Sequence, residues 1–171
     1  MSSTLFFGYS TTLLDERVFE IVPTAKFRTI AKLQNHKLVF NDAANYESPW
    51  HGATANIVPC DGEEVWGVVY ETEQPNIGVL EKHLVGERGI YVAHGVMVTT
   101  PKGKMLTCTC LKLRDPLPLE GVPSPQYLSV LIAGAVQKNL PKDYIAKLKS
   151  SKHNSYDGKI GISEKILLAS I

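Results

Sequence analysis

The segment that most constrains the fold is Glu63–Glu71, whose sequence EEVWGVVYE is a nearly continuous apolar run. Short runs of this kind, without strict alternation, are typical of strands that are buried on both faces. Asp61-Gly62 comes directly before the run, and this dipeptide is the strongest hairpin signal in the chain. We therefore expect a central strand that a tight turn joins to a preceding strand at Trp50–Pro59.

The rest of the chain divides into strand-like segments and later helices. Further strands are expected at Ser3–Tyr9, Ala25–Phe40, Gly89–Pro101 and Lys104–Arg114, the last two joined by a turn at residues 101–104. Helices are expected at residues 10–19, 74–86, 124–138 and 141–150, with a weaker one from Ser163. This order indicates an α+β fold, in which a mostly antiparallel sheet is long enough to close into a barrel flanked by helices.

Composition excludes several classes of function. The 171 residues suit one domain, residues 1–171, and 18 basic against 17 acidic residues leave a formal charge of +1. This balance gives no electrostatic footprint for nucleic acid or an anionic membrane surface. No apolar run approaches the length of about 18 residues that a membrane span needs. The first ten residues show no signal peptide.

The cysteines and histidines show no metal-ligand spacing. Cys108 and Cys110 are two apart on one face of an expected strand, which is poor geometry for a mutual disulfide. Reduced cysteines indicate a cytoplasmic protein. We expect no metal and no cofactor, because five histidines stand without a paired ligand: His36, His51, His83, His94 and His153.

Several short segments follow the pattern of one family when they are taken in chain order. They include Ala31–Phe40, Trp50-His51-Gly52, Glu64–Tyr70, Gly89–Tyr91, Pro123–Tyr127 and Tyr156–Lys159. Over about residues 5–158, their order and spacing resemble the gamma-glutamylcyclotransferases. The resemblance implies a small mixed, mostly antiparallel β-barrel with flanking helices and a side pocket. Family members often form homodimers, so the resemblance leaves both a monomer and a homodimer open.

The resemblance also implies a reaction. Family members convert a gamma-glutamyl amide into 5-oxoproline and a free amine. A loop written YGSN holds the glutamyl group through backbone N–H donors. A glutamate at the end of the inserted helix takes a proton from the α-amine, which attacks the side-chain carbonyl carbon.

The sequence departs from the family at both of these features. Aligned without gaps, the loop falls on Gly8-Tyr9-Ser10-Thr11, which keeps only Ser10 in place. A β-carbon where the family has glycine hinders close approach of the backbone. The catalytic glutamate falls on Leu84, which has no group that accepts a proton.

Two nearby carboxylates could replace the missing base. Glu81 is three residues from Leu84, about 300° around a helix, and so near the same face but one turn away. Glu87 lies beyond Gly86 and reaches the site only if the turn takes another route. His83 points about 100° away from Leu84.

Our main hypothesis is that catalysis has been lost and that the former active site binds a more hydrophobic small ligand, apolar or aromatic. One alternative is an active cyclotransferase with a displaced general base, Glu81 or Glu87. A second alternative is an interaction protein whose pocket is filled. The predicted ligand-binding residues are mostly apolar or aromatic: Phe6, Phe7, Gly8, Tyr9, Ser10, Thr11, Leu84, Tyr91 and Tyr127.

Overall fold

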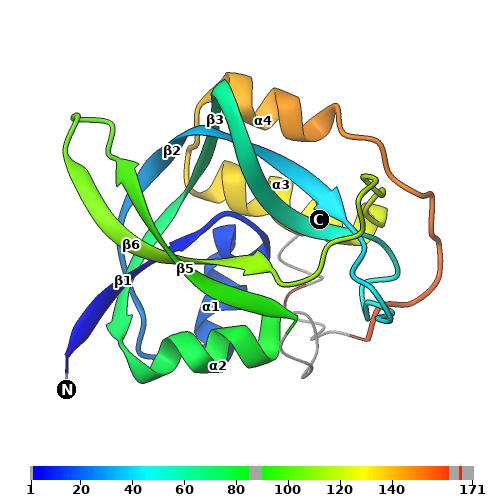
Figure 1. The fold of residues 1–171 in the computed structure, drawn as a ribbon, viewed down its shortest axis with the longest axis horizontal. Coiled ribbons are helices and arrows are strands. Elements are labelled where there is room, and N and C mark those ends of the chain that lie inside the picture. Colours follow the sequence, from blue (N-terminus) through cyan, green and yellow to red (C-terminus); the bar gives the residue numbers. More distant parts are fainter. Residues whose placement is uncertain (1, 85–89, 162–165, 167–171) are drawn as a thin grey trace.

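A computed structural model describes residues 2–84, 90–161 and 166. Its centre is a closed β-barrel with the strand order β1-β3-β2-β5-β6, around which the helices pack (Figure 1). The strands are β1 (Ser3–Gly8), β2 (Lys26–Asn41), β3 (Thr54–Glu73), β5 (Tyr91–Thr99) and β6 (Met105–Leu113). All neighbouring strands are antiparallel except β1 and β6, which are parallel, so the predicted mixed barrel is confirmed.

The helices are η1 (Thr11–Leu13), α1 (Asp15–Ile21), α2 (Pro75–His83), α3 (Pro125–Gln137) and α4 (Lys142–Lys149). In Figure 1, α3 and α4 lie along the long β2–β3 ribbon, whereas α2 lies beside β5. The start of α3 follows the sequence prediction, because the Ser124 hydroxyl accepts a hydrogen bond from the Tyr127 N–H. The expected last helix from Ser163 falls largely outside the described residues. Among the described helices, none has the length and apolar character needed to cross a membrane.

The predicted hairpin at Asp61-Gly62 is wrong. The segment Thr54–Glu73 is a single strand that pairs with β2 along both of its halves. Gln34 pairs with Glu64 and His36 with Pro59, so residues 60–63 lie opposite Asn35 alone. Gly62 has a φ of 83° and donates its N–H to the Asn35 side-chain oxygen at 3.1 Å. The Asp-Gly signal therefore marks an irregularity inside a long ribbon.

The predicted helix at residues 10–19 is also corrected. It is split at Leu14, whose φ of −90° and ψ of 124° are extended, into the 3₁₀ turn η1 and the helix α1. The Ser10 side chain makes no capping hydrogen bond to this segment. Gly134 of α3 packs against the break, since a β-carbon at that glycine would lie 2.6 Å from atoms of Leu13 and Leu14. The helix α3 therefore lies close against the η1–α1 junction.

Candidate active site

Two buried tyrosines from distant elements meet at the peptide of Ala55, near the start of β3. The Tyr91 hydroxyl donates to the Ala55 carbonyl oxygen at 2.7 Å. The Ala55 N–H donates to the Tyr127 hydroxyl oxygen at 2.8 Å. Because Ser124 caps the first turn of α3, the position of Tyr127 is fixed from both the helix and the strand. The structure thus brings together Tyr91 and Tyr127, two of the predicted ligand-binding residues.

The loop after β1 lies against this pair. The hydroxyl of Ser10 is within hydrogen-bonding reach of Tyr127, and the side chain of Thr11 is buried. A β-carbon on Gly8 would lie 2.4 Å from the Thr12 Oγ1 atom, so only glycine lets the chain fold back so closely. Gly8 therefore supplies a close backbone approach one position before Tyr9. As the opening of a helical turn, this loop also presents N–H groups that have no acceptor within the turn.

The aromatic residues of β1 point to opposite faces of the strand. Phe6 pairs with Tyr70, whose ring contacts Phe19 of α1 at a centroid distance of 6.3 Å. Phe7 and Tyr9 share the other face, with their ring centroids 6.5 Å apart. The structure therefore does not bring Phe6 together with Phe7 and Tyr9. The Tyr9 hydroxyl donates to the carbonyl oxygen of Leu111, which ties the loop to β6.

Leu84 lies directly after α2 with a helical backbone conformation, and it is buried, with 4% of its surface exposed. Its carbonyl oxygen accepts a hydrogen bond from Arg17 Nη2 at 2.9 Å, and that of His83 accepts one from the same nitrogen at 3.2 Å. Arg17 of α1 thus holds the end of α2. Orphan carbonyls at a helix C-terminus favour a cation.

Arg17 is the functional candidate that the sequence reasoning missed. Its guanidinium group is buried, lies 6.0 Å from the centre of the Trp50 ring and is paired with Glu20 at 3.4 Å. Its Nε atom is buried without a hydrogen-bond partner among the described atoms. Burial lowers the pKa of Arg17. Burial raises the pKa of Tyr127, and the positive charge of Arg17 offsets part of that rise. One signal was available: Arg17 stands between Leu14 and Val18 at helical spacing, on a face that is otherwise apolar.

The tyrosines of the site are hydrogen-bond donors at neutral pH. Burial raises the pKa of Tyr127 to about 12, and it raises the pKa of Tyr91 and of Tyr9 well above the ordinary value. All three phenols therefore keep their protons at neutral pH and cannot serve there as general bases. The Tyr127 oxygen accepts the Ala55 N–H, and the hydroxyls of Ser10 and Tyr91 are its side-chain hydrogen-bond partners.

The structure describes one of the two carboxylates that were named as replacement bases. Glu81 is half-buried on α2, beside the buried face that contains Ile77, Leu80 and Leu84. Glu87 lies outside the described residues. Three described cavities, of about 450, 530 and 360 Å³, are lined by other parts of the chain and include none of the predicted ligand-binding residues.

Comparison with known proteins gives close relatives. Bovine (Bos taurus) gamma-glutamylcyclotransferase is 40% identical over 166 residues, which cover 96% of this chain and 86% of the relative. The human (Homo sapiens) enzyme is 38% identical with the same coverage of both chains. The mouse (Mus musculus) enzyme is 39% identical over 158 residues, 91% of this chain and 82% of the relative. A model of the AIG2-like family matches residues 64–148.

Solved structures agree with the sequence relatives. A gamma-glutamyl cyclotransferase structure superposes with a TM-score of 0.90 at 36% identity, covering 99% of this chain and 98% of that one. YkqA from Bacillus subtilis superposes with a TM-score of 0.69 at 19% identity, covering 90% of this chain and 57% of that one. The second likeness shows the shared fold alone.

These relatives correct the main functional hypothesis. Relatives named as cyclotransferases match nearly the full length of the chain at about 40% identity. They do not support the hypothesis that the chain has lost catalysis and binds a hydrophobic ligand. They favour the alternative, an active cyclotransferase. On these identities and this superposition, the chain belongs to the gamma-glutamylcyclotransferase family.

Proposed function

We propose that this protein releases 5-oxoproline from a gamma-glutamyl amide. The observation that carries the proposal is the 40% identity to a gamma-glutamylcyclotransferase over 96% of the chain. In this reaction the α-amine attacks the γ-carbonyl carbon, a ring C–N bond forms and the original amide C–N bond breaks. The proton lost by the α-amine ends on the leaving amine, so no co-reactant is consumed. Free Cys60, Cys108 and Cys110 accord with a reducing compartment, so we place the reaction in the cytoplasm.

The loop after β1 is the proposed cradle for the glutamyl group. The chain turns back tightly at Gly8, and the loop that follows it places the Ser10 hydroxyl within hydrogen-bonding reach of Tyr127. N–H groups at such a turn favour an anion. The buried positive charge of Arg17 adds a favourable potential for a carboxylate. Tyr127 then donates its proton to a substrate oxygen.

The proposed general base is a carboxylate that stands elsewhere than at position 84. Leu84 offers only a hydrocarbon side chain, whereas Glu81 is half-buried one turn earlier on the same helix. Glu87 is the second candidate. A base in this role takes the proton of the α-amine and returns it to the leaving nitrogen.

Turnover by the purified protein tests the proposal directly. We expect gamma-glutamyl-alanine to yield 5-oxoproline, measured by mass spectrometry against a blank without protein. Either Glu81→Gln or Glu87→Gln should lower kcat by about 10²–10⁴-fold, the usual contribution of a general base. Glu120→Gln, an exposed loop residue, is the matched control and should leave kcat unchanged. Absence of 5-oxoproline above the blank would contradict the proposed activity.

The variant Leu84→Glu distinguishes two hypotheses: that Glu81 or Glu87 serves as the general base, and that the base has to stand at position 84. If Glu81 or Glu87 is the base, a carboxylate at position 84 adds no new step, and kcat should not rise. A kcat well above that of the parent protein would show that position 84 is where the base acts, and the displaced base would be wrong. Circular dichroism checks that the variant is folded, since burying a carboxyl group there is costly.

A further inference from the structure

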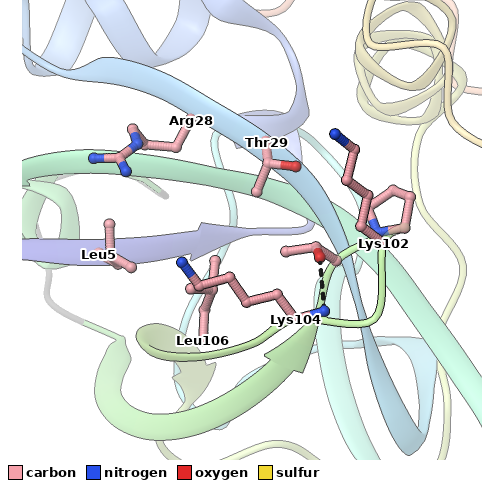
Figure 2. A pocket seen from close by; sticks show the side chains of 8 residues that line it. Leu5, Arg28, Thr29, Lys102, Lys104 and Leu106 are labelled. Atoms are coloured by element: carbon pink, nitrogen blue, oxygen red, sulfur yellow. Dashed lines mark hydrogen bonds between the residues drawn. The ribbon is translucent and has the colours of Figure 1, made fainter.

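The β5–β6 hairpin turns at one end of the closed barrel. Within the described strands, β5 is bonded to β2 at Lys32 and Thr99 alone, and β6 is bonded to β1 at Phe6 and Thr109 alone. Residues 100–104 form the hairpin turn beyond the bridge at Thr99. A cavity of about 450 Å³ lies at this end of the barrel, between the hairpin tip and strands β1 and β2 (Figure 2).

The floor of this cavity is apolar. Leu5 of β1 and Leu106 of β6 line it, and both are half-buried. Two residues further along the same strand faces, Phe7 and Cys108 are buried in the barrel core. The cavity is therefore a pocket in the end of the barrel, closed below by packed side chains.

The rim of the cavity is cationic. Arg28, Lys102 and Lys104 all line it, and the Arg28 guanidinium group is paired with the carboxylate of Glu71. Neither lysine ammonium group forms an ion pair with any described residue. In Figure 2 the Lys104 side chain runs back from the turn, past Leu106 and in the direction of Leu5.

The turn that carries the lysines is well ordered by its own hydrogen bonds. The Thr100 N–H donates to the Lys104 carbonyl at 2.8 Å, and the Gly103 N–H donates to the Thr100 carbonyl at 2.9 Å. The Lys104 N–H also donates to the Thr100 hydroxyl at 3.1 Å. A prebuilt turn lowers the ordering cost of binding, because its backbone is already fixed.

We propose that this cavity is a second binding site, which takes a small organic anion with an apolar body. Its volume is within the range of about 300–1,000 Å³ typical of small-molecule sites. Two unpaired ammonium groups favour an anionic head, and the leucine floor favours a hydrocarbon body. The positive charge at this rim is local, since the chain as a whole has a net charge of only +1.

This site is separate from the candidate active site. Along β1 the cavity lies at Leu5, near the start of the strand, whereas the proposed cradle follows Gly8 at its end. Along β5, Tyr91 begins the strand and Thr99 ends it beside the cavity. The two sites therefore occupy opposite ends of the barrel, with buried Phe7 and Val98 between them.

Nuclear magnetic resonance of the ¹⁵N-labelled full chain tests the proposal with octanoate as the probe. We expect octanoate to shift the amide signals of Leu5, Thr100 and Leu106 in a saturable way. Octanol, which has the same body without the charge, and inorganic sulfate, which has charge without the body, should each bind more weakly. Equal binding of sulfate or octanol would overturn the proposed ligand class. Shifts confined to residues 10–13 and Tyr127, or no shifts at all, would overturn the site.

Variants of the rim give the second arm. The double change Lys102→Gln and Lys104→Gln should weaken octanoate binding at least about tenfold, because two charge-assisted contacts are lost. Lys149→Gln with Lys152→Gln, on exposed residues elsewhere, is the matched control and should leave the affinity unchanged. Release of 5-oxoproline should be the same in all of these proteins. An octanoate affinity that is the same in both double variants would contradict the proposal, whatever the result for cyclotransferase activity.

Discussion

At the scale of single residues, Arg17 joins two parts of the candidate site. One guanidinium nitrogen holds the carbonyl groups of His83 and Leu84, while the group as a whole lies over Trp50. A buried arginine with this geometry is difficult to replace, because a lysine lacks the planar fork of donors. The end of α2, where the resemblance locates the base, is therefore positioned by a residue of α1.

We predict that Arg17→Met destabilises the protein by about 1–3 kcal/mol, since it leaves buried carbonyl groups unpaired. Arg17→Lys should retain part of the stability but not the full kcat/KM. Urea denaturation and 5-oxoproline release measure the two effects. Arg114→Met, at an exposed arginine, is the matched control. A stability of Arg17→Met equal to that of the parent protein would show that the guanidinium contacts carry no net stabilisation.

Tyr127 allows a second test at this scale. Tyr127→Phe leaves the buried Ala55 N–H without its acceptor, so we expect a loss of about 1–3 kcal/mol in the free energy of unfolding. It should also lower kcat/KM, because the proposed donor to the substrate is removed. Tyr156→Phe removes a hydroxyl from a more exposed position and should change neither quantity. Unchanged turnover in Tyr127→Phe would argue against the proposed role of the hydroxyl.

At the scale of elements, the junction between β1 and η1 decides where the proposed cradle lies. Gly8 ends β1, and the chain turns back so that Thr12 occupies the space of a β-carbon on residue 8. Packing of Gly134 against Leu13 and Leu14 holds η1 from the other side. The loop is therefore fixed by two glycines far apart in sequence, and neither has a positive φ.

Gly8→Ala should destabilise the protein by about 1–3 kcal/mol, because the new methyl group meets Thr12 at a distance that forces the loop to move. Gly78→Ala is the matched control: nothing lies within 4 Å of its β-carbon position, and the helix should gain about 0.5–1 kcal/mol. Thermal and urea denaturation measure both. If Gly8→Ala were as stable as the parent, the close approach would not constrain the loop.

At the scale of the whole molecule, the core contains several buried tyrosines and cysteines whose pKa is raised. Burial raises the pKa of Cys108 to about 11 and that of Cys110 to about 12. Burial is also the main cause that raises the pKa of five tyrosines: Tyr9, Tyr70, Tyr91, Tyr127 and Tyr144. The pKa of Tyr127 rises to about 12. The unfolded chain would release these protons near the ordinary values of 9.0 for cysteine and 10.0 for tyrosine.

Stability should therefore fall steeply in alkali. Above the ordinary cysteine and tyrosine values the unfolded state binds fewer protons than the folded state, so the free energy of unfolding decreases as pH rises. The loss should begin near pH 9 and continue past the Tyr127 pKa of about 12. Urea midpoints across this range measure it, and phenolate absorbance should show the buried tyrosines ionising only on unfolding. A constant free energy of unfolding across the range would contradict the prediction.

Much of the architecture could be predicted from local sequence. The Ser124-Pro125 start of α3, the turn at residues 101–104 and the long strand β2 all follow signals within a few residues. The Asp61-Gly62 signal failed because its local preference is compatible with an irregularity as well as with a hairpin. Pairing of β3 with β2 on both sides of Asn35 decided between them. The predicted continuous helix over residues 10–19 was also wrong, because Leu14 is extended at the point where α3 packs against the chain.

The sequence by itself determined the family and the barrel, because these depend on segments whose order and spacing survive in the chain. The tyrosines of the candidate site stay a prediction from the resemblance. Only the tertiary structure showed that Ala55 holds both Tyr91 and Tyr127, across 36 and 72 residues, and that Arg17 holds the end of α2 across 66. It also placed Phe6 on the far side of β1, and it opened a cationic cavity at the other end of the barrel. Hydrogen bonds and cavities form between residues far apart in the chain, so periodicity and spacing do not encode them.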